Sequence, residues 1–293
     1  MCLAGIFIWR VKIILKIALC VKQVPDTTNI KWTENNTMQR EGVESIINPY
    51  DVYAAELALK IKESIDKDVE ITAFTMGPMQ ASDMLRKLIS LGVDNGVLIS
   101  DRKFAGADTY ATGKTIAAAI KTVMPDFDLI ICGQFAVDGD TAQTGPSIAG
   151  NLGISQVTYV KSFEKIDKKS IVLKRELDDG IETVKASYPL LLCVLQDTFE
   201  PRRPLINGIK LASKSEIKIL SADDIGLNPE DVGLKGSPTF VSRAYRNLSN
   251  HNAQKYELSV EESAELLKNK LEEYCHSEFD LKSDNSQKEA NDA

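Results

Sequence analysis

The sequence predicts an α/β fold: a doubly wound, mostly parallel, Rossmann-like sheet with an inserted antiparallel hairpin and a C-terminal arm. Up to residue 153, short apolar runs alternate with longer runs of helical periodicity, which indicates strands joined by right-handed crossovers. After residue 155, apolar and polar residues alternate on both sides of an Asp-Gly turn, which is typical of a hairpin. From Glu200 onward, prolines, glycines and single charges dominate, and the segment has no core of its own.

The first half of the chain is expected to contain four strand–helix pairs. The run KIALCV is continuously apolar, as strands buried on both faces are. The next helix has a favourable start, because Asn48 can cap it, Pro49 suits the first helical position and Asp51 lies near the positive end of the helix dipole. The expected strands are 16–21, 69–77, 95–101 and 128–133, and the expected helices are 48–64, 79–92, 108–124 and 141–153.

The second half is expected to pair residues 170–177 with 181–187 in the hairpin and to add a core strand at 189–195. The arm that follows contains a short helix at 204–213 and a strand at 216–220, and it needs a partner surface. Near the end, a helix at 259–275 is amphipathic, and the last dozen residues are polar and expected to be disordered. Its apolar side consists of Val260, Leu266, Leu267 and Leu271. The predicted regions are an atypical leader (1–14), the α/β domain (15–200), the arm (201–246), and a C-terminal helix with a polar tail (247–293).

Composition disfavours several classes of protein. The net charge of −7 disfavours nucleic-acid binding, because such proteins carry a basic footprint. The five cysteines form no C-x-x-C pair, and we interpret those at 20, 132 and 193 as buried thiols in a reducing, cytoplasmic compartment. The two histidines lie beyond residue 250, which leaves little material for a metal site or a Ser-His-Asp triad. Arg10 and Lys12 interrupt the apolar N-terminus, so membrane insertion is not expected.

Ligands of doubly wound sheets bind beyond the carboxyl ends of the strands. Four loops of this kind should therefore meet at one edge of the sheet, namely 22–29, 76–80, 105–112 and 134–146. The last loop is the richest in polar and small residues. Gly139 and Gly145 allow close approach of a ligand, while Thr141 and Thr144 offer donors at a helix N-terminus, which favours anion binding. The loop matches neither G-x-G-x-x-G nor a Walker motif.

An alternative interpretation of the same loop is purely structural. Asp140 followed by Gln143 three residues later resembles a capping box, in which the two side chains satisfy the first amides of a helix. From the residues alone, a phosphate-binding loop and an ordinary helix cap remain equally open. No pair of carboxylates suggests acid–base chemistry, so no catalytic residue is predicted.

Five motifs occur in order: CVKQVPDT, NPYDVYAAELALKIKE, ADTYAT, DLIICGQFAVDGDTAQTGPSIAGNLG and EPRRPLINGIKLASK. Together they resemble the β subunit of electron-transfer flavoproteins over residues 15–245. The resemblance implies an adenine-nucleotide-binding domain that pairs with an α subunit carrying FAD. It also implies a second nucleotide in the β subunit, which is AMP in ordinary members and FAD in bifurcating ones. The wording VDGDTAQTGP resembles the bifurcating type and favours FAD, with AMP as the alternative.

In bifurcating members, the second FAD accepts a hydride from NADH, or donates one to NAD. Electrons pass between ferredoxin and, through the α-subunit FAD, a partner flavin-dependent dehydrogenase of the acyl-CoA, enoyl-CoA or lactate type. The resemblance therefore implies NAD(H), ferredoxin, the α subunit and such a dehydrogenase as partners. The leader and the C-terminal helix depart from the family pattern. The leader would be extra sequence or an upstream-start artefact, and the helix would contact a dehydrogenase or be a solvated appendage.

The resemblance also assigns residues, and no metal ligand is among them. The pyrophosphate would be held by Asp138, Gly139, Asp140, Thr141, Ala142, Gln143, Thr144 and Gly145. The adenosine would be bordered by Ala18, Val21, Asn48, Asp51, Met76 and Gly77. The flavin side would be formed by Asp108, Thr109 and Thr112. Partner recognition would involve Glu200, Pro201, Arg202 and the apolar anchor Leu205, next to an arm that wraps the α subunit.

Overall fold

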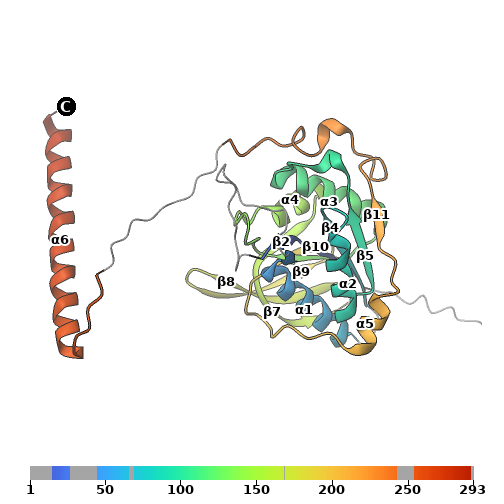
Figure 1. Ribbon diagram of the computed structural model, residues 1–293, viewed down its shortest axis with the longest axis horizontal. Helices are drawn as coiled ribbons and strands as arrows, with labels where there is room; N and C mark the ends of the chain where they lie inside the picture. Colours follow the sequence, from blue (N-terminus) through green and yellow to red (C-terminus); the bar gives the residue numbers. More distant parts are fainter. Residues whose placement is uncertain (1–14, 27–44, 66–68, 168, 243–253, 292–293) are drawn as a thin grey trace, which may run out of the picture. The chain divides into compact units, whose positions relative to one another are not determined.

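The computed structural model describes residues 15–26, 45–65, 69–167, 169–242 and 254–291 (Figure 1). The chain divides into two compact units, residues 1–245 and 246–293. Within the described residues of the first unit, nine strands form one sheet in the order β11-β5-β4-β1-β6-β10-β7-β8-β9. They are β1 (Leu15–Cys20), β4 (Val69–Met76), β5 (Asn95–Ile99), β6 (Leu129–Gly133), β7 (Ser155–Ile166), β8 (Ser170–Leu177), β9 (Gly180–Ser187), β10 (Leu190–Val194) and β11 (Lys218–Leu220).

The predicted doubly wound, mostly parallel sheet is confirmed. The strands from β11 to β7 run parallel, whereas β8 and β9 are antiparallel additions. The chain moves from β1 through β4 to β5, then returns to place β6 on the other side of β1. The winding direction therefore reverses between β1 and β6, which is where such sheets bind ligands.

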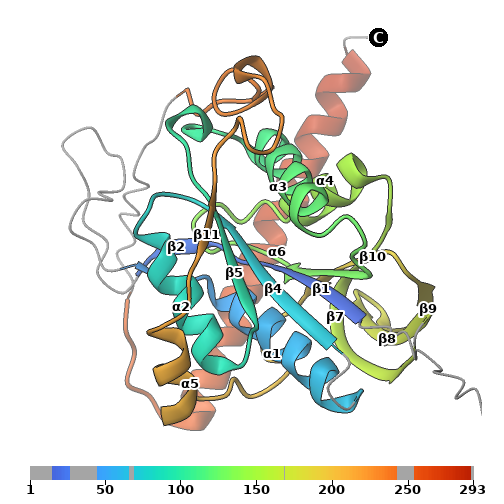
Figure 2. The same ribbon diagram turned by 90° about the vertical axis from the view of Figure 1, so that its right-hand side faces the viewer.

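Helices cover both faces of the sheet (Figure 2). They are α1 (Pro49–Ser64), α2 (Ala81–Leu91), α3 (Thr109–Val123), α4 (Thr144–Leu152) and α5 (Ile206–Ala212). Alternation along β1 explains the two layers, because successive side chains of a strand point to opposite faces. Ile17 and Leu19 join the core beneath α1 and α2, whereas Ala18 and Cys20 join the core beneath α3 and α4.

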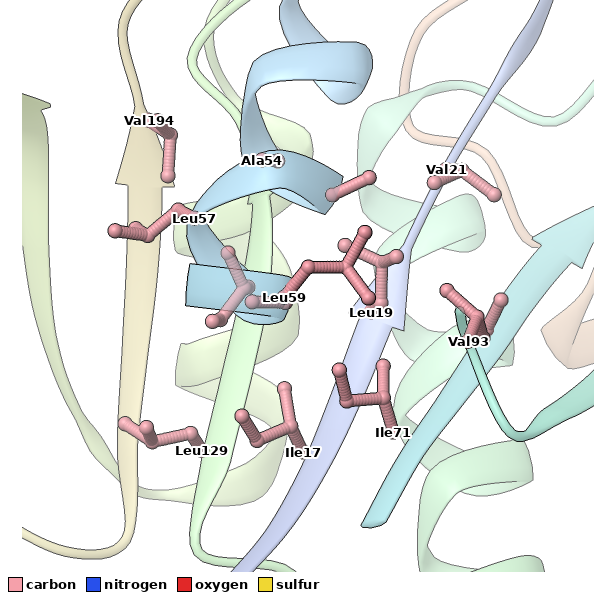
Figure 3. Packing of buried hydrophobic residues seen from close by; sticks show 14 of the residues in the cluster. Ile17, Leu19, Val21, Ala54, Leu57, Leu59, Ile71, Val93, Leu129 and Val194 are labelled. Carbon is pink, nitrogen blue, oxygen red and sulfur yellow. The ribbon is translucent and has the colours of Figure 1, made fainter. Parts of the chain in front are cut away.

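The core beneath α1 is built from aliphatic side chains. Figure 3 shows α1 lying across the sheet with Leu59 directed toward Leu19 of β1. Leu19 and Leu57 are fully buried. Each such side chain contributes about 1.5–3 kcal/mol through removal from water, so this layer fixes the start of α1 above the strand ends.

Several elements differ from the expectations. The predicted hairpin is extended by β7, a twelve-residue strand that pairs with β8 and joins the insertion to β10. A separate small sheet pairs β2 (Gln23–Pro25) with β3 (Ser45–Ile47) where only a loop was expected. Short 3-10 turns lie at Arg102–Phe104 and Pro229–Asp231. Strand β7 was missed because its partner β10 is distant in the sequence. Strands β2 and β3 were missed because three residues are too few to show a period.

The described part of the segment predicted as an arm, residues 201–242, packs on the α/β domain. Strand β11 pairs with β5 at the sheet edge, and Leu220 is buried there. Helix α5 packs on α2 so closely that a Cβ at Gly208 would collide with the backbone oxygen of Ser90. Irregular composition concealed this docking, because the apolar residues that carry it are too widely spaced to show a period.

The second unit contains α6 (Val260–Asn291). A capping box starts this helix: the Ser259 amide donates to Glu262 Oε2 at 3.0 Å, and the Glu262 amide donates to Ser259 Oγ at 3.3 Å. The predicted helix is thus confirmed, but it continues through most of the expected polar tail, a stretch that lacks glycine and proline. The predicted leader lies outside the described residues. Among the helices described, none has both the length and the apolarity needed to cross a membrane.

Candidate functional site

A cavity of 650 Å³ lies at the carboxyl ends of β1 and β6. It falls within the size range of small-molecule sites and at the point where the winding direction reverses. As predicted, the described parts of all four loops contribute to its lining. Of the predicted cofactor residues, the lining includes Val21, Asn48, Asp51, Met76, Gly77, Asp108, Thr109, Thr112 and the whole run from Asp138 to Gly145.

Ala18 is the predicted cofactor residue that does not line the cavity. It lies two residues before the end of β1 and is fully buried in the core beneath α3 and α4. Cys20, at the end of the strand, lines the cavity instead. Burial raises the pKa of the Cys20 thiol, which keeps it protonated and compatible with an apolar wall.

The loop before α4 does not form the capping box that the sequence left open as an alternative. Helix α4 begins at Thr144, and neither Asp140 nor Gln143 caps it with its side chain. Asp140 and Ala142 have positive φ angles of 48° and 53°, a conformation that non-glycine residues rarely adopt. Such local strain is concentrated at functional sites in proteins.

The amides of this loop are free for a ligand. Among the described residues, none of the backbone N–H groups of residues 141–145 has a hydrogen-bond acceptor. The first amides of a helix lack intrahelical partners and carry its positive dipole end. Consecutive amides at a helix start, after left-handed residues, are suited to an anion such as phosphate.

Asn48 and Asp51, at the start of α1, hold the loops of the cavity together. The Asn48 side chain does not cap its own helix. Its Nδ2 donates to the Phe135 backbone oxygen at 2.7 Å, and its Oδ1 accepts from the Val137 amide at 3.2 Å. Asp51 accepts from the Lys22 amide at 2.7 Å and from the Gly133 amide at 2.9 Å. Both polar side chains are thus engaged by backbone groups of the loops.

Asp51 is a buried carboxyl group with competing influences. Burial raises its pKa to about 7, although the two amide hydrogen bonds and Asn48 act to lower it. Its close approach to β6 depends on glycine, because a Cβ at Gly133 would lie 2.5 Å from Asp51 Oδ1. Asp51, which holds two loops of the cavity, therefore changes its charge near neutral pH.

Gly145 allows α4 to approach two thiols, one of which, that of Cys132, lines the cavity. Cys132 and Cys193 face each other on β6 and β10 with their Sγ atoms 3.7 Å apart. A Cβ at Gly145 would lie 2.5 Å from the Cys193 Sγ and 3.0 Å from the Cys132 Sγ. Glycine is needed here because any larger residue would push the helix start away from the sheet.

The third group of predicted residues lies at the start of α3. Asp108 caps this helix by accepting from the amides of Tyr110 and Ala111 at 3.0 and 2.9 Å. Its other oxygen accepts from the amide and hydroxyl of Thr239 at 3.0 and 2.8 Å. The Thr109 hydroxyl donates to Gln143 Oε1 at 3.1 Å, so α3 and the amide-bearing loop are joined across the cavity.

The lining residues that sequence reasoning did not assign to the site include Thr239, Cys132 and Lys22. Thr239 was missed because it follows Asp108 by 131 residues. Cys132 was assigned only to the core. Lys22 was passed over although it directly follows a predicted strand, a position that could have identified it. Its Nζ lies 2.6 Å from Asp138 Oδ1.

The described residues offer no cluster of three or more metal-ligating side chains.

The predicted partner-recognition residues lie away from the cavity lining. Arg202 is held within the chain: its Nε and Nη2 donate to the two oxygens of Glu56 at 2.9 Å, and its Nη1 donates to Glu63 at 2.6 Å. Beyond Arg202 and Pro204, the chain presents Leu205, which is 77% exposed. Three more exposed aliphatic side chains follow on α5, and the first two, Ile206 and Ile209, form an apolar patch with Leu205. Glu200 and Pro201 precede this apolar patch.

Comparison with known proteins agrees with this geometry. Residues 35–225 match the family model described as Electron transfer flavoprotein domain. The chain is similar to the electron transfer flavoprotein subunit beta of Megasphaera elsdenii, with 43% identity over 79% of this chain and 87% of the relative. It is also similar to the caffeyl-CoA reductase-Etf complex subunit CarD of Acetobacterium woodii, with 46% identity over 79% and 87%. The acryloyl-CoA reductase electron transfer subunit gamma of Anaerotignum propionicum is 41% identical over 79% and 88%.

Proposed function

The chain belongs to the electron transfer flavoprotein family, as a β subunit, and from this premise we propose that its cavity holds a second FAD in addition to one carried by the α subunit. The observation that supports this most directly is the row of free amides at residues 141–145. A pyrophosphate is a multiply charged anion, and backbone N–H groups at a helix start are its usual ligands in α/β folds. Thr141 and Thr144 add hydroxyl groups to the same lining.

The extent of the cavity favours a dinucleotide over AMP. Its lining extends beyond the amide-bearing loop to Val21 and Met76, after β1 and β4, and to Asp108, Thr109 and Thr112 at the start of α3. In this proposal a dinucleotide would contact both groups of residues, whereas AMP would leave part of the lining without a ligand. In this proposal, Asn48 and Asp51 act by holding the loops rather than by contacting the adenosine directly.

We propose that the β-subunit site exchanges a hydride with NAD(H) and divides electrons between ferredoxin and, through the α subunit, a flavin-dependent dehydrogenase. When bound, FAD would supply the hydride and single-electron chemistry. The protein then has to bind, orient and insulate the cofactor, which needs no catalytic acid or base. This agrees with a chain whose two histidines lie beyond residue 250. The similar caffeyl-CoA and acryloyl-CoA reductase subunits support a partner of the CoA-reductase kind.

We further propose that the exposed patch of Leu205, Ile206 and Ile209 meets the partner dehydrogenase. Exposed apolar patches of this kind mark interaction sites on protein surfaces. Arg202 would contribute indirectly, because its ion pairs with α1 fix the position of the patch. The later part of the 201–246 segment would contact the α subunit, where Phe240 and Val241 are strongly exposed.

The experiment that tests the cofactor is a nucleotide count on the co-purified α and β subunits. Two FAD per heterodimer, with ferredoxin reduction that depends on both NADH and the dehydrogenase substrate, would support the proposal. One FAD and one AMP would contradict it and identify an ordinary carrier. Two FAD without ferredoxin reduction would retain the cofactor assignment and reject bifurcation.

A further inference from the structure

Carboxylate side chains outnumber cationic side chains in the described lining of the cavity. Among its described lining residues there are one side-chain cation, Lys22, and four carboxylates, Asp51, Asp108, Asp138 and Asp140. Backbone amides hold Asp51 and Asp108. Asp138 instead holds Lys22, with its Oδ1 2.6 Å from the ammonium nitrogen. The cation best placed to meet a phosphate is therefore bound to a carboxylate of the amide-bearing loop.

The backbone of Lys22 is held by two hydrogen bonds, whereas its ammonium group is paired with a single carboxylate on a half-exposed side chain. The Lys22 amide donates to Asp51 at 2.7 Å, and its carbonyl oxygen accepts from the Asn48 amide at 2.9 Å. The side chain is 49% exposed, whereas that of Asp138 is 14% exposed. Asp138 lies three residues before the first free amide at Thr141. A lysine side chain is long and flexible, so a small rotation can transfer its ammonium between neighbouring anions.

We propose that Lys22 is a phosphate-binding residue and that Asp138 is its internal competitor. Binding of a nucleotide's phosphate groups would draw the ammonium from the carboxylate, so Asp138 lowers the affinity that Lys22 provides. This inference rests on the proposed function and names the two side chains that set the affinity of its site. If the ion pair were only structural, joining the loop after β1 to the loop after β6, the loss of either partner would weaken binding.

Calorimetric titration of the full-length chain with ADP separates the two cases. Lys22→Met should weaken ADP binding about tenfold, because a charged hydrogen bond to phosphate is lost. Asp138→Asn should strengthen ADP binding about threefold, because the competing charge is removed while the size of the side chain is retained. The double variant should bind like Lys22→Met. Lys22→Arg should retain most of the affinity, and adenosine, which has no phosphate, should bind all variants equally.

The chain contains a matched control. Lys16, at the opposite end of β1, forms an ion pair of the same 2.6 Å length with Asp126. Lys16→Met and Asp126→Asn should leave ADP binding unchanged. The inference is overturned if Asp138→Asn weakens ADP binding as Lys22→Met does, or if Lys22→Met binds ADP like the parent. If the parent chain binds no adenine nucleotide, the proposed function itself fails, which is a distinguishable result.

Discussion

Replacing Arg202 with methionine should destabilise the first compact unit, because it removes the guanidinium that holds a buried carboxylate and leaves that carboxylate a longer ion pair with Lys60, whose Nζ lies 3.9 Å from Glu56 Oε1. Glu56 on α1 is 4% exposed. Its two oxygens accept from Arg202 Nε and Nη2 at 2.9 Å, and one also accepts from the Arg202 amide at 3.2 Å. Methionine retains the hydrogen bond from the backbone amide and much of the aliphatic stem, but it removes both hydrogen bonds from the guanidinium group to Glu56. The arginine was predicted to recognise a partner, and its geometry indicates a stabilising role as well.

The expected loss of unfolding free energy is about 3 kcal/mol, the lower end of the range for breaking a buried ion pair. We take the lower end because the Arg202 side chain is 28% exposed and its second partner, Glu63, is 61% exposed. For a unit of this size, a change of about 3 kcal/mol lowers the melting temperature by about 6–12 °C.

Urea unfolding of the parent and the variant at several pH values tests this reasoning. Burial acts to raise the pKa of Glu56, but the hydrogen bonds from Arg202 outweigh it and hold the pKa below its ordinary value. The ion pair therefore stabilises the parent at neutral pH and loses this effect as the pH falls through the folded pKa. In Arg202→Met the buried Glu56 takes up a proton more readily, so the difference between variant and parent should shrink toward about pH 4.

Arg203→Met is the matched control, because Arg203 is adjacent and exposed. A surface substitution of this kind should change stability by no more than about 0.5 kcal/mol. The reasoning is refuted if the two variants lose the same stability, or if the loss in Arg202→Met is independent of pH.

Three further predictions concern the site and the patch. Gly145→Ala should lower nucleotide content, because its Cβ would lie 2.5 Å from the Cys193 Sγ, whereas Gly150→Ala on the same helix meets nothing within 4 Å and should retain it. Between about pH 4 and 7, folded Asp51 keeps a proton that the unfolded chain has released, so the parent should lose stability as the pH rises. In urea unfolding, Asp51→Asn should reduce the slope of stability against pH, and an unchanged slope would contradict the assignment. Leu205→Ser should slow electron transfer to the dehydrogenase while stability stays within about 0.5 kcal/mol; unchanged kinetics would remove Leu205 from the interface.

The sequence predicted the strands and helices that carry strong local patterns. β1 and β6 were found because they are short, continuously apolar and followed by polar loops, and α3 because Asp108 caps it as expected. The same local logic failed for β7, whose strand character depends on pairing with β10 and β8. Ala18, which the resemblance placed beside the adenosine, lies in the core beneath α3 and α4 and outside the cavity lining.

By itself, the sequence determined the order of the elements, the meeting of four loops at one sheet edge and the composition of the amide-bearing loop. It left a helix cap and a phosphate loop equally open. The tertiary structure shows that the side-chain cap does not form and that five consecutive amides are free, in a loop whose start Asn48 holds from 87 and 89 residues away. The same holds for Lys22 and Asp138, which are 116 residues apart, and for Arg202 and Glu56, which are 146 apart. Contacts at such separations depend on how the strands are ordered in the sheet, and no local pattern of residues encodes them.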